Sequence, residues 1–186
     1  MVGGACVVEE PPAGWPMIFR LSLKLAQKLK VKTLATVPLA ENPFADWTAN
    51  LFEMGRREHI IVANTRTFYC VVLPGDEASD LSEFLNQALR SLCASLGDDG
   101  LGFLQPHLKV PALADVQFAK AADRRVTGSM VELVKIAKSS PENPSYMLPQ
   151  LGHGLNGIIM SSLDFRGDGS WGTPLQAFKE LANAAR

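Results

Sequence analysis

The sequence predicts an α+β fold in a single domain, an antiparallel β-sheet with a central hairpin packed by about four to five helices. Three observations predict this class. Two apolar runs at residues 59–63 and 67–73 flank a short polar turn, as in a β-hairpin. Other segments repeat their apolar residues with the period of a helix. Hairpin pairing outweighs strand–helix–strand repetition, and no internal repeat or second domain is evident in the 186 residues.

The chain is expected to begin with a flexible N-terminal arm at residues 1–16, followed by the domain at residues 17–186. The arm is rich in Gly and Pro and lacks the basic and apolar regions of a signal peptide. Residues 17–21 are apolar and predict a strand. Ser22 is suited to cap a following helix that buries Leu25, Ala26 and Leu29.

A short helix and then the hairpin are expected next. Asp46 is a plausible cap for a helix over residues 46–55, which would carry Trp47 and Leu51 and end at Gly55. Both hairpin strands are apolar on both faces, so we expect them at the centre of the sheet. Pro74 and Gly75 end the second strand.

The clearest helical pattern runs over residues 80–96. Its leucines follow the 3.6-residue period, Asp80 and Glu83 resemble a capping box, and Gly97 supplies a stop. Residues 116–120 are compatible with a further strand.

The last third of the chain predicts two more helices. Ser129 and Glu132 form a capping box for a helix that ends before Pro141. Residues 155–163 are apolar and fit either a helix or a strand. Thr173 and Pro174 then suit the cap and first position of a final helix.

Composition narrows the location and the partners. The 18 Lys and Arg nearly balance the 19 Asp and Glu, and the net charge of -1 argues against a dedicated nucleic-acid domain. No apolar run is long enough to span a membrane. Cys6, Cys70 and Cys93 are odd in number and lack paired spacing, which indicates a reduced, cytoplasmic protein.

The familiar chemical motifs are weak in this chain. Gly152, Gly154 and Gly157 match a dinucleotide-binding fingerprint, but no strand precedes them and no acidic residue follows at the required spacing. The three histidines are scattered, and the Asp98–Asp99 pair follows a helix stop and fits a turn. We therefore expect neither a cofactor nor a metal site.

Several basic and aromatic residues near predicted strand ends are not explained by packing. Paired arginines can clamp a phosphate or carboxylate, and aromatic rings can supply a stacking surface. The alternative is ordinary surface ion pairing with Glu53, Glu58 and Asp123, which contributes about 0 to 1 kcal/mol for each pair. The candidate ligand-binding residues are Trp47, Arg56, Arg57, Asn64, Tyr69, Lys120, Arg124 and Arg125.

A series of short motifs runs along the chain in a fixed order. They are the opening MIFR at residues 17–20, Trp47 with ANLF at 49–52, Arg56-Arg57, Asn64, residues 71–75, residues 118–120, RRV at 124–126 with GSM at 128–130, and Leu155-Asn156. Together they resemble a family of uncharacterised bacterial proteins, a domain of unknown function. The resemblance covers most of residues 17–180 and implies no activity, cofactor or partner.

Two functions of different classes remain open. The first is a non-catalytic binding or interaction module, in which the basic strand ends form a pocket for an anionic ligand or an acidic protein partner. The second is a toxin-type ribonuclease, in which the arginines and Lys120 hold phosphate while Tyr69 or His59 moves protons. Whether the protein is an enzyme stays undecided, and nucleic acid is the less favoured partner because the total charge is close to neutral. Both functions require the candidate residues to converge on one concavity.

Overall fold

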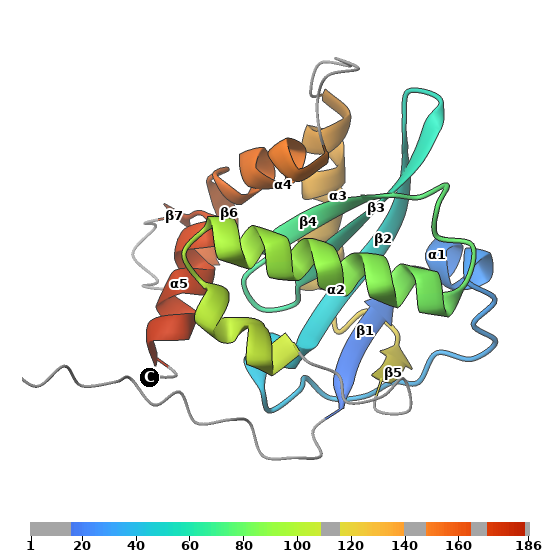
Figure 1. Cartoon of the computed structure of the whole chain (residues 1–186), viewed down its shortest axis with the longest axis horizontal. Coiled ribbons are helices and arrows are strands. Elements are labelled where there is room, and N and C mark those ends of the chain that lie inside the picture. The colour runs from blue at the N-terminus through green and yellow to red at the C-terminus, as the bar shows by residue number, and fades with distance from the viewer. Residues whose placement is uncertain (1–15, 109–115, 140–147, 165–170, 185–186) are drawn as a thin grey trace, which may run out of the picture.

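The computed structural model describes residues 16–108, 116–139, 148–164 and 171–184. The N-terminal arm expected at residues 1–16 lies, apart from Pro16, outside the described residues. The fold is α+β, as the sequence predicts. A five-stranded sheet forms the centre, and Figure 1 shows helices packed around it.

The sheet has the strand order β4-β3-β2-β1-β5. Strands β2 (Asp46–Met54), β3 (Arg57–Asn64) and β4 (Cys70–Pro74) form an antiparallel meander. β1 (Met17–Leu21) pairs in parallel with β2 on one side and with β5 (Val116–Ala119) on the other. The sheet is therefore mixed and not wholly antiparallel, because the chain passes through α1 (Leu23–Lys28) and a loop before it enters β2 in the direction of β1.

The prediction of a helix over residues 46–55 is wrong, because residues 46–54 form the nine-residue strand β2. Both faces of β2 are covered, so Trp47, Ala49 and Leu51 enter one core while Phe52 enters the other. A strand buried on both sides loses the alternation of apolar and polar residues, and its apolar residues then mimic helical spacing. Eight residue pairs with β3 fix the strand conformation.

The hairpin at residues 59–73 is confirmed, although only one of its strands is central. β3 lies between β2 and β4, whereas β4 is the last strand on its side of the sheet. Helix α4 (Leu148–Asn156) packs on β4 and covers that edge. The apolar character of β4 therefore reflects cover by a helix at the edge and not a central position.

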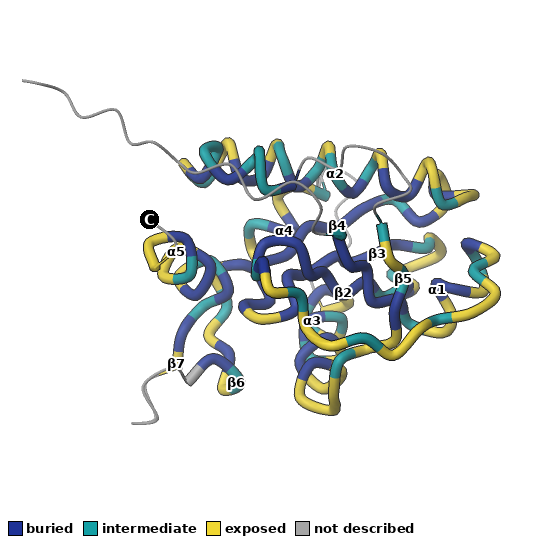
Figure 2. Tube along the Cα trace, turned by 90° about the horizontal axis from the view of Figure 1, so that it is seen from below, coloured by how far each residue is buried: buried dark blue, intermediate teal, exposed yellow. Residues whose placement is uncertain are grey.

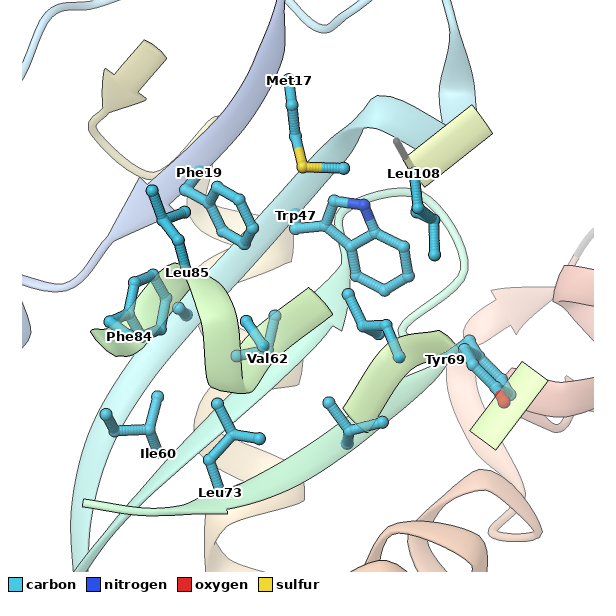
Figure 3. Close-up of a cluster of buried hydrophobic side chains, with 14 of the residues drawn as sticks. Met17, Phe19, Trp47, Ile60, Val62, Tyr69, Leu73, Phe84, Leu85 and Leu108 are labelled. Atoms are coloured by element: carbon cyan, nitrogen blue, oxygen red, sulfur yellow. The ribbon is translucent and has the colours of Figure 1, made fainter. Parts of the chain in front are cut away.

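Two helical layers enclose the sheet, as Figure 2 shows in edge view. The long helix α2 (Leu81–Asp98) covers one face, where Phe84 and Leu85 pack with Phe19 and Trp47 in the core of Figure 3. Asp80 caps α2 as predicted. Helices α3 (Arg124–Ser139) and α4 cover the other face.

The N-terminus of α3 lies six residues earlier than predicted. The cap is Asp123, whose Oδ1 accepts a hydrogen bond of 2.8 Å from the amide of Val126, and not Ser129, which is buried inside the helix. Arg124 and Arg125 consequently belong to the first turn of a helix. The ambiguous segment at 155–163 divides between the end of α4 and strand β6 (Met160–Asp164).

The remaining elements are a small second sheet, the last helix and two 3-10 segments. β6 pairs with the short strand β7 (Trp171–Gly172), and α5 (Pro174–Ala184) begins at the predicted cap. Two 3-10 segments, η1 (Pro43–Ala45) and η2 (Gly102–Leu108), lie beside the first core. No helix within the described ranges is long and apolar enough to cross a membrane.

Candidate functional site

Three of the predicted site residues are fully buried and serve the fold. Trp47 donates from Nε1 to the carbonyl of Phe44 at 2.8 Å. Asn64 holds the turn after β3: its Oδ1 accepts from the amides of Arg66 and Thr67, and its Nδ2 donates to the carbonyl of Pro43. Figure 3 shows Tyr69 at the border of the same core.

The charged candidates lie on separate parts of the surface. Arg57 and Asn64 stand at opposite ends of β3, seven residues and roughly 23 Å apart. Arg56 lies in the turn before Arg57. Lys120 follows β5, and Arg124 and Arg125 begin α3, where Arg125 donates to the carbonyl of Ser162. The structure therefore does not bring the eight residues around one concavity.

The two residues that a ribonuclease would need for proton transfer are enclosed. His59 is 7% exposed, and its Nδ1 lies 3.1 Å from the carbonyl of Arg57. Tyr69 is 0% exposed. Neither side chain is open to solvent.

A buried ion pair between Arg20 and Asp46 was missed at the sequence level. Arg20 donates from Nε and Nη2 to both carboxylate oxygens of Asp46, at 2.7 and 2.8 Å. Its other donors bond to the carbonyls of Val37, Pro38 and Lys120. These five bonds match the five N–H donors of a guanidinium group, so no capacity remains for a ligand. A single arginine inside an apolar strand was the available signal.

A groove between α2 and α4, with β4 as its floor, is a concave site lined wholly by described residues. We call it the α2–α4 groove; its volume is about 520 Å³. Its polar lining residues are Arg90, Ser91, Ser95, Asp98 and His153, and its apolar ones are Val71, Val72, Pro74, Ala94, Leu148, Pro149 and Gly152. A second cavity, of about 340 Å³, lies beside Pro38 and Ile18 and carries one charged residue, Glu41.

Close packing of α4 on the edge of β4 builds the floor of the groove. The side-chain amide of Asn156 accepts from the Cys70 amide at 2.7 Å and donates to the Cys70 carbonyl at 2.9 Å, as a neighbouring strand would. At Gly152 a Cβ atom would lie 3.5 Å from the backbone of Cys70 and Val71, which leaves no room for a long side chain. The glycines of the fingerprint motif thus belong to a helix packed on a strand.

A cluster of carboxylates surrounds His153 at one end of the α2–α4 groove. Nε2 of His153 lies 3.7 Å from Asp98 Oδ2, and Nδ1 lies 3.6 Å from Asp99 Oδ1. The hydroxyl of Tyr69 donates to Asp99 Oδ2 at 2.6 Å, and Ser95 Oγ lies 3.0 Å from the same hydroxyl. Burial, and then the bond to Asp99, raise the pKa of Tyr69 above its ordinary value.

Residues 18–177 match the model of a domain of unknown function, DUF6933. The chain belongs to the DUF6933 family. The match spans both the Arg20–Asp46 pair and every residue that lines the α2–α4 groove. No curated protein and no solved structure matches the chain.

In this DUF6933 chain the polar groups of the groove have few partners. Among the described residues, the Arg90 side chain forms no hydrogen bond or ion pair, and no hydroxyl or thiol hydrogen-bonds to His153. No group of three His, Cys, Asp or Glu side chains in the described ranges is arranged to hold a metal ion, and this includes Asp98, Asp99 and His153. The groove therefore offers an apolar surface and charges at fixed places, without an activated nucleophile.

Proposed function

We propose that the protein is a non-catalytic binding module that holds a small ligand in the α2–α4 groove. The binding function is the one expected from the sequence, but the pocket differs from the expected one. Arg90, and not the arginines at the strand ends, supplies its positive charge. The volume lies within the range of about 300–1,000 Å³ that is typical of small-molecule sites.

One observation carries the proposal. Charged side chains that have no hydrogen-bond partner in the described part of the chain border an apolar cavity, whereas the predicted site residues in the core use their polar atoms to hold the fold. A polar group that the fold does not use is available to fix the orientation of a ligand. Arg90 and Asp98 meet this condition in the same groove.

A cytoplasmic location is part of the proposal. Cys70 and Cys93 are free thiols. Burial raises the pKa of both, to about 12 for Cys70, so the thiolates that react with oxidants are rare at neutral pH. Such thiols fit a reducing compartment.

A thermal-shift screen with a variant that fills the groove tests the proposal. Ala94 is exposed and lines the groove, so Ala94→Trp should fill it without entering the core. Ser82→Trp, at the opposite end of α2, is the matched control. The screen uses a library of small organic acids, amines and amino acids.

A true ligand at 100 times its dissociation constant should raise the melting temperature of the wild type and of Ser82→Trp by roughly 5–10 °C. The same compound should leave Ala94→Trp unshifted. Mass spectrometry should recover it unchanged. Hits that stabilise all three proteins equally would reject the groove, and chemical conversion of a hit would reject the non-catalytic role.

A further inference from the structure

The two ends of the α2–α4 groove carry opposite charge. Arg90 lies at one end, and Asp98 with Asp99 and His153 lies at the other. Arg90 and Asp98 are eight residues apart on α2, which is about 12 Å along a helix axis. This distance is too long for the two side chains to pair with each other. Among the described residues the Arg90 side chain has no partner, and the carboxylate of Asp98 has only the contact of 3.7 Å with Nε2 of His153.

Backbone dipoles reinforce this polarity. α2 and α4 run in the same direction along β4, as Figure 1 shows, and the contacts of Asn156 with Cys70 and of His153 with Asp98 place both C-termini at the acidic end. Helix C-termini carry partial negative charge and favour cations. The first turn of α4, at Leu148 and Pro149, lies nearer to the Arg90 end and contributes partial positive charge there.

The middle of the groove is largely apolar, although Ser91 and Ser95 also line it. Ala94 and Val72 line it between the charged ends, together with Leu148 and Pro149. A ligand segment that lies there gains free energy by burying methylene groups. A compact ion without an apolar part would contact only one end.

We propose that the ligand is an elongated zwitterion, with its anionic group at Arg90, its cationic group at Asp98, and an aliphatic segment between them. This inference rests on the proposed function, because it names the class of ligand for the same groove. His153 lies between the two aspartates and adds a hydrogen-bonding group beside the cationic end. The charge order along the groove fixes the direction in which the ligand lies.

Linear amino acids test the inference directly. The probe is 8-aminooctanoate, whose charged groups are separated by roughly 10 Å when the chain is extended. Octanoate and octylamine keep the aliphatic segment and lack one charge each, and 4-aminobutyrate keeps both charges but is too short. Binding is measured with the full chain by titration of backbone amide NMR shifts.

We expect 8-aminooctanoate to bind with a dissociation constant on the order of millimolar. Its affinity should exceed that of octanoate and of octylamine by about fivefold each, since one partly exposed ion pair contributes up to about that factor. Amide shifts should follow residues 90–98 and 148–153. Equal affinity for all three eight-carbon compounds, or no binding of 8-aminooctanoate, would overturn the inference.

Two variants assign the ends. Arg90→Gln should lower the affinity for 8-aminooctanoate and octanoate and leave that for octylamine unchanged. Asp98→Asn should lower the affinity for octylamine and leave that for octanoate unchanged. Asp76→Asn, an exposed substitution outside the groove, is the control. Loss of octanoate binding in Asp98→Asn would contradict the assigned direction.

The failure of this inference can be told apart from failure of the proposed function. If 8-aminooctanoate does not bind but other compounds shift the wild type and not Ala94→Trp, the ligand class is wrong and the binding module stands. If no compound distinguishes the wild type from Ala94→Trp, both are wrong.

Discussion

Arg20 and Asp46 lie inside the protein and bond fully to each other and to nearby backbone. The side chains of Arg90 and Asp98 lie at the rim of a groove and form no hydrogen bonds within the described ranges, although Asp98 lies 3.7 Å from His153. Both sets combine arginine with aspartate beside the same sheet. The first pair ties the loop at Val37 and Pro38 to β1 and β2. The comparison shows that a ligand site differs from a structural one in having polar side-chain atoms without hydrogen-bond partners, and not in charge itself.

Breaking the buried pair should have the largest effect. Asp46→Asn leaves the Arg20 guanidinium without a counterion in a site that is 1% exposed, and we expect a loss of about 3–5 kcal/mol of unfolding free energy. Urea denaturation measures the change.

The control is Glu53→Gln, which removes a pair of nearly the same length, 2.6 Å from Lys24, on the surface. Solvent already screens that pair, so its loss should leave the urea midpoint unchanged within error. If Asp46→Asn costs no more than Glu53→Gln, the contrast between the buried network and the rim charges fails.

Removing the amide that supports the groove floor should have the second largest effect. Asn156→Ala leaves the buried amide and carbonyl of Cys70 without partners, which should cost about 2–3 kcal/mol. Hydrogen exchange at the Cys70 amide should accelerate as well. Asn86→Ala, on the exposed face of α2, is the control and should change neither quantity. Unchanged exchange at Cys70 in Asn156→Ala would show that α4 does not depend on this side chain.

The elements that sequence reasoning predicted well are those with local signals. α2 has its cap and its period within its own residues, although it continues through the predicted stop at Gly97 and ends at Asp98. The hairpin has its turn at Asn64. β2 failed because its pairing with β3 and β1 overrides a helix-like local pattern. Arg20 gave a local signal, because it is a charged residue in an apolar strand. Its partner Asp46, however, was predicted to cap a helix.

The groove had no local signal at all. In the sequence, Asp98 and Asp99 fit a turn after the predicted helix, and His153 is one of three scattered histidines. These residues are more than 50 positions apart and meet only because α4 returns to cover the edge of β4. Long-range packing of this kind is not encoded in periodicity or spacing. The resemblance to a domain of unknown function, confirmed by the match to residues 18–177, added no site residues.

Stability at high pH should distinguish the buried Cys70 and Tyr69 from the exposed side chains at the rim of the groove. Burial raises the pKa of Cys70 to about 12, and burial with the Asp99 bond raises that of Tyr69. A raised pKa means that the folded state keeps a proton that the unfolded state releases. The stabilisation is complete below about pH 9 and is lost as pH rises toward 12, at about 1.4 kcal/mol per pH unit for each group.

Urea midpoints between pH 8 and 11 measure this slope. Between about pH 9 and 10 Cys70 should dominate, because the ordinary pKa of tyrosine is higher. Cys70→Ala should therefore flatten the curve there, whatever its effect at pH 8. Cys93→Ala is the matched thiol control and should flatten the curve less, since Cys93 is only partly buried. Equal flattening by the two variants would indicate that the floor is not drier than the helix surface.

The smallest change in stability should come from the rim itself. Arg90→Gln and Asp98→Asn remove the charge from side chains that form no hydrogen bonds among the described residues. Each should therefore shift the free energy of unfolding by less than about 0.5 kcal/mol. Because the two positions are about 12 Å apart on α2, the double variant should equal the sum of the singles. Arg20 and Asp46 form one network, and their double variant should depart from additivity. A destabilisation by Arg90→Gln close to that of Asp46→Asn would mean that the rim charges hold the fold, and the groove would then lose the property that marks it as a ligand site.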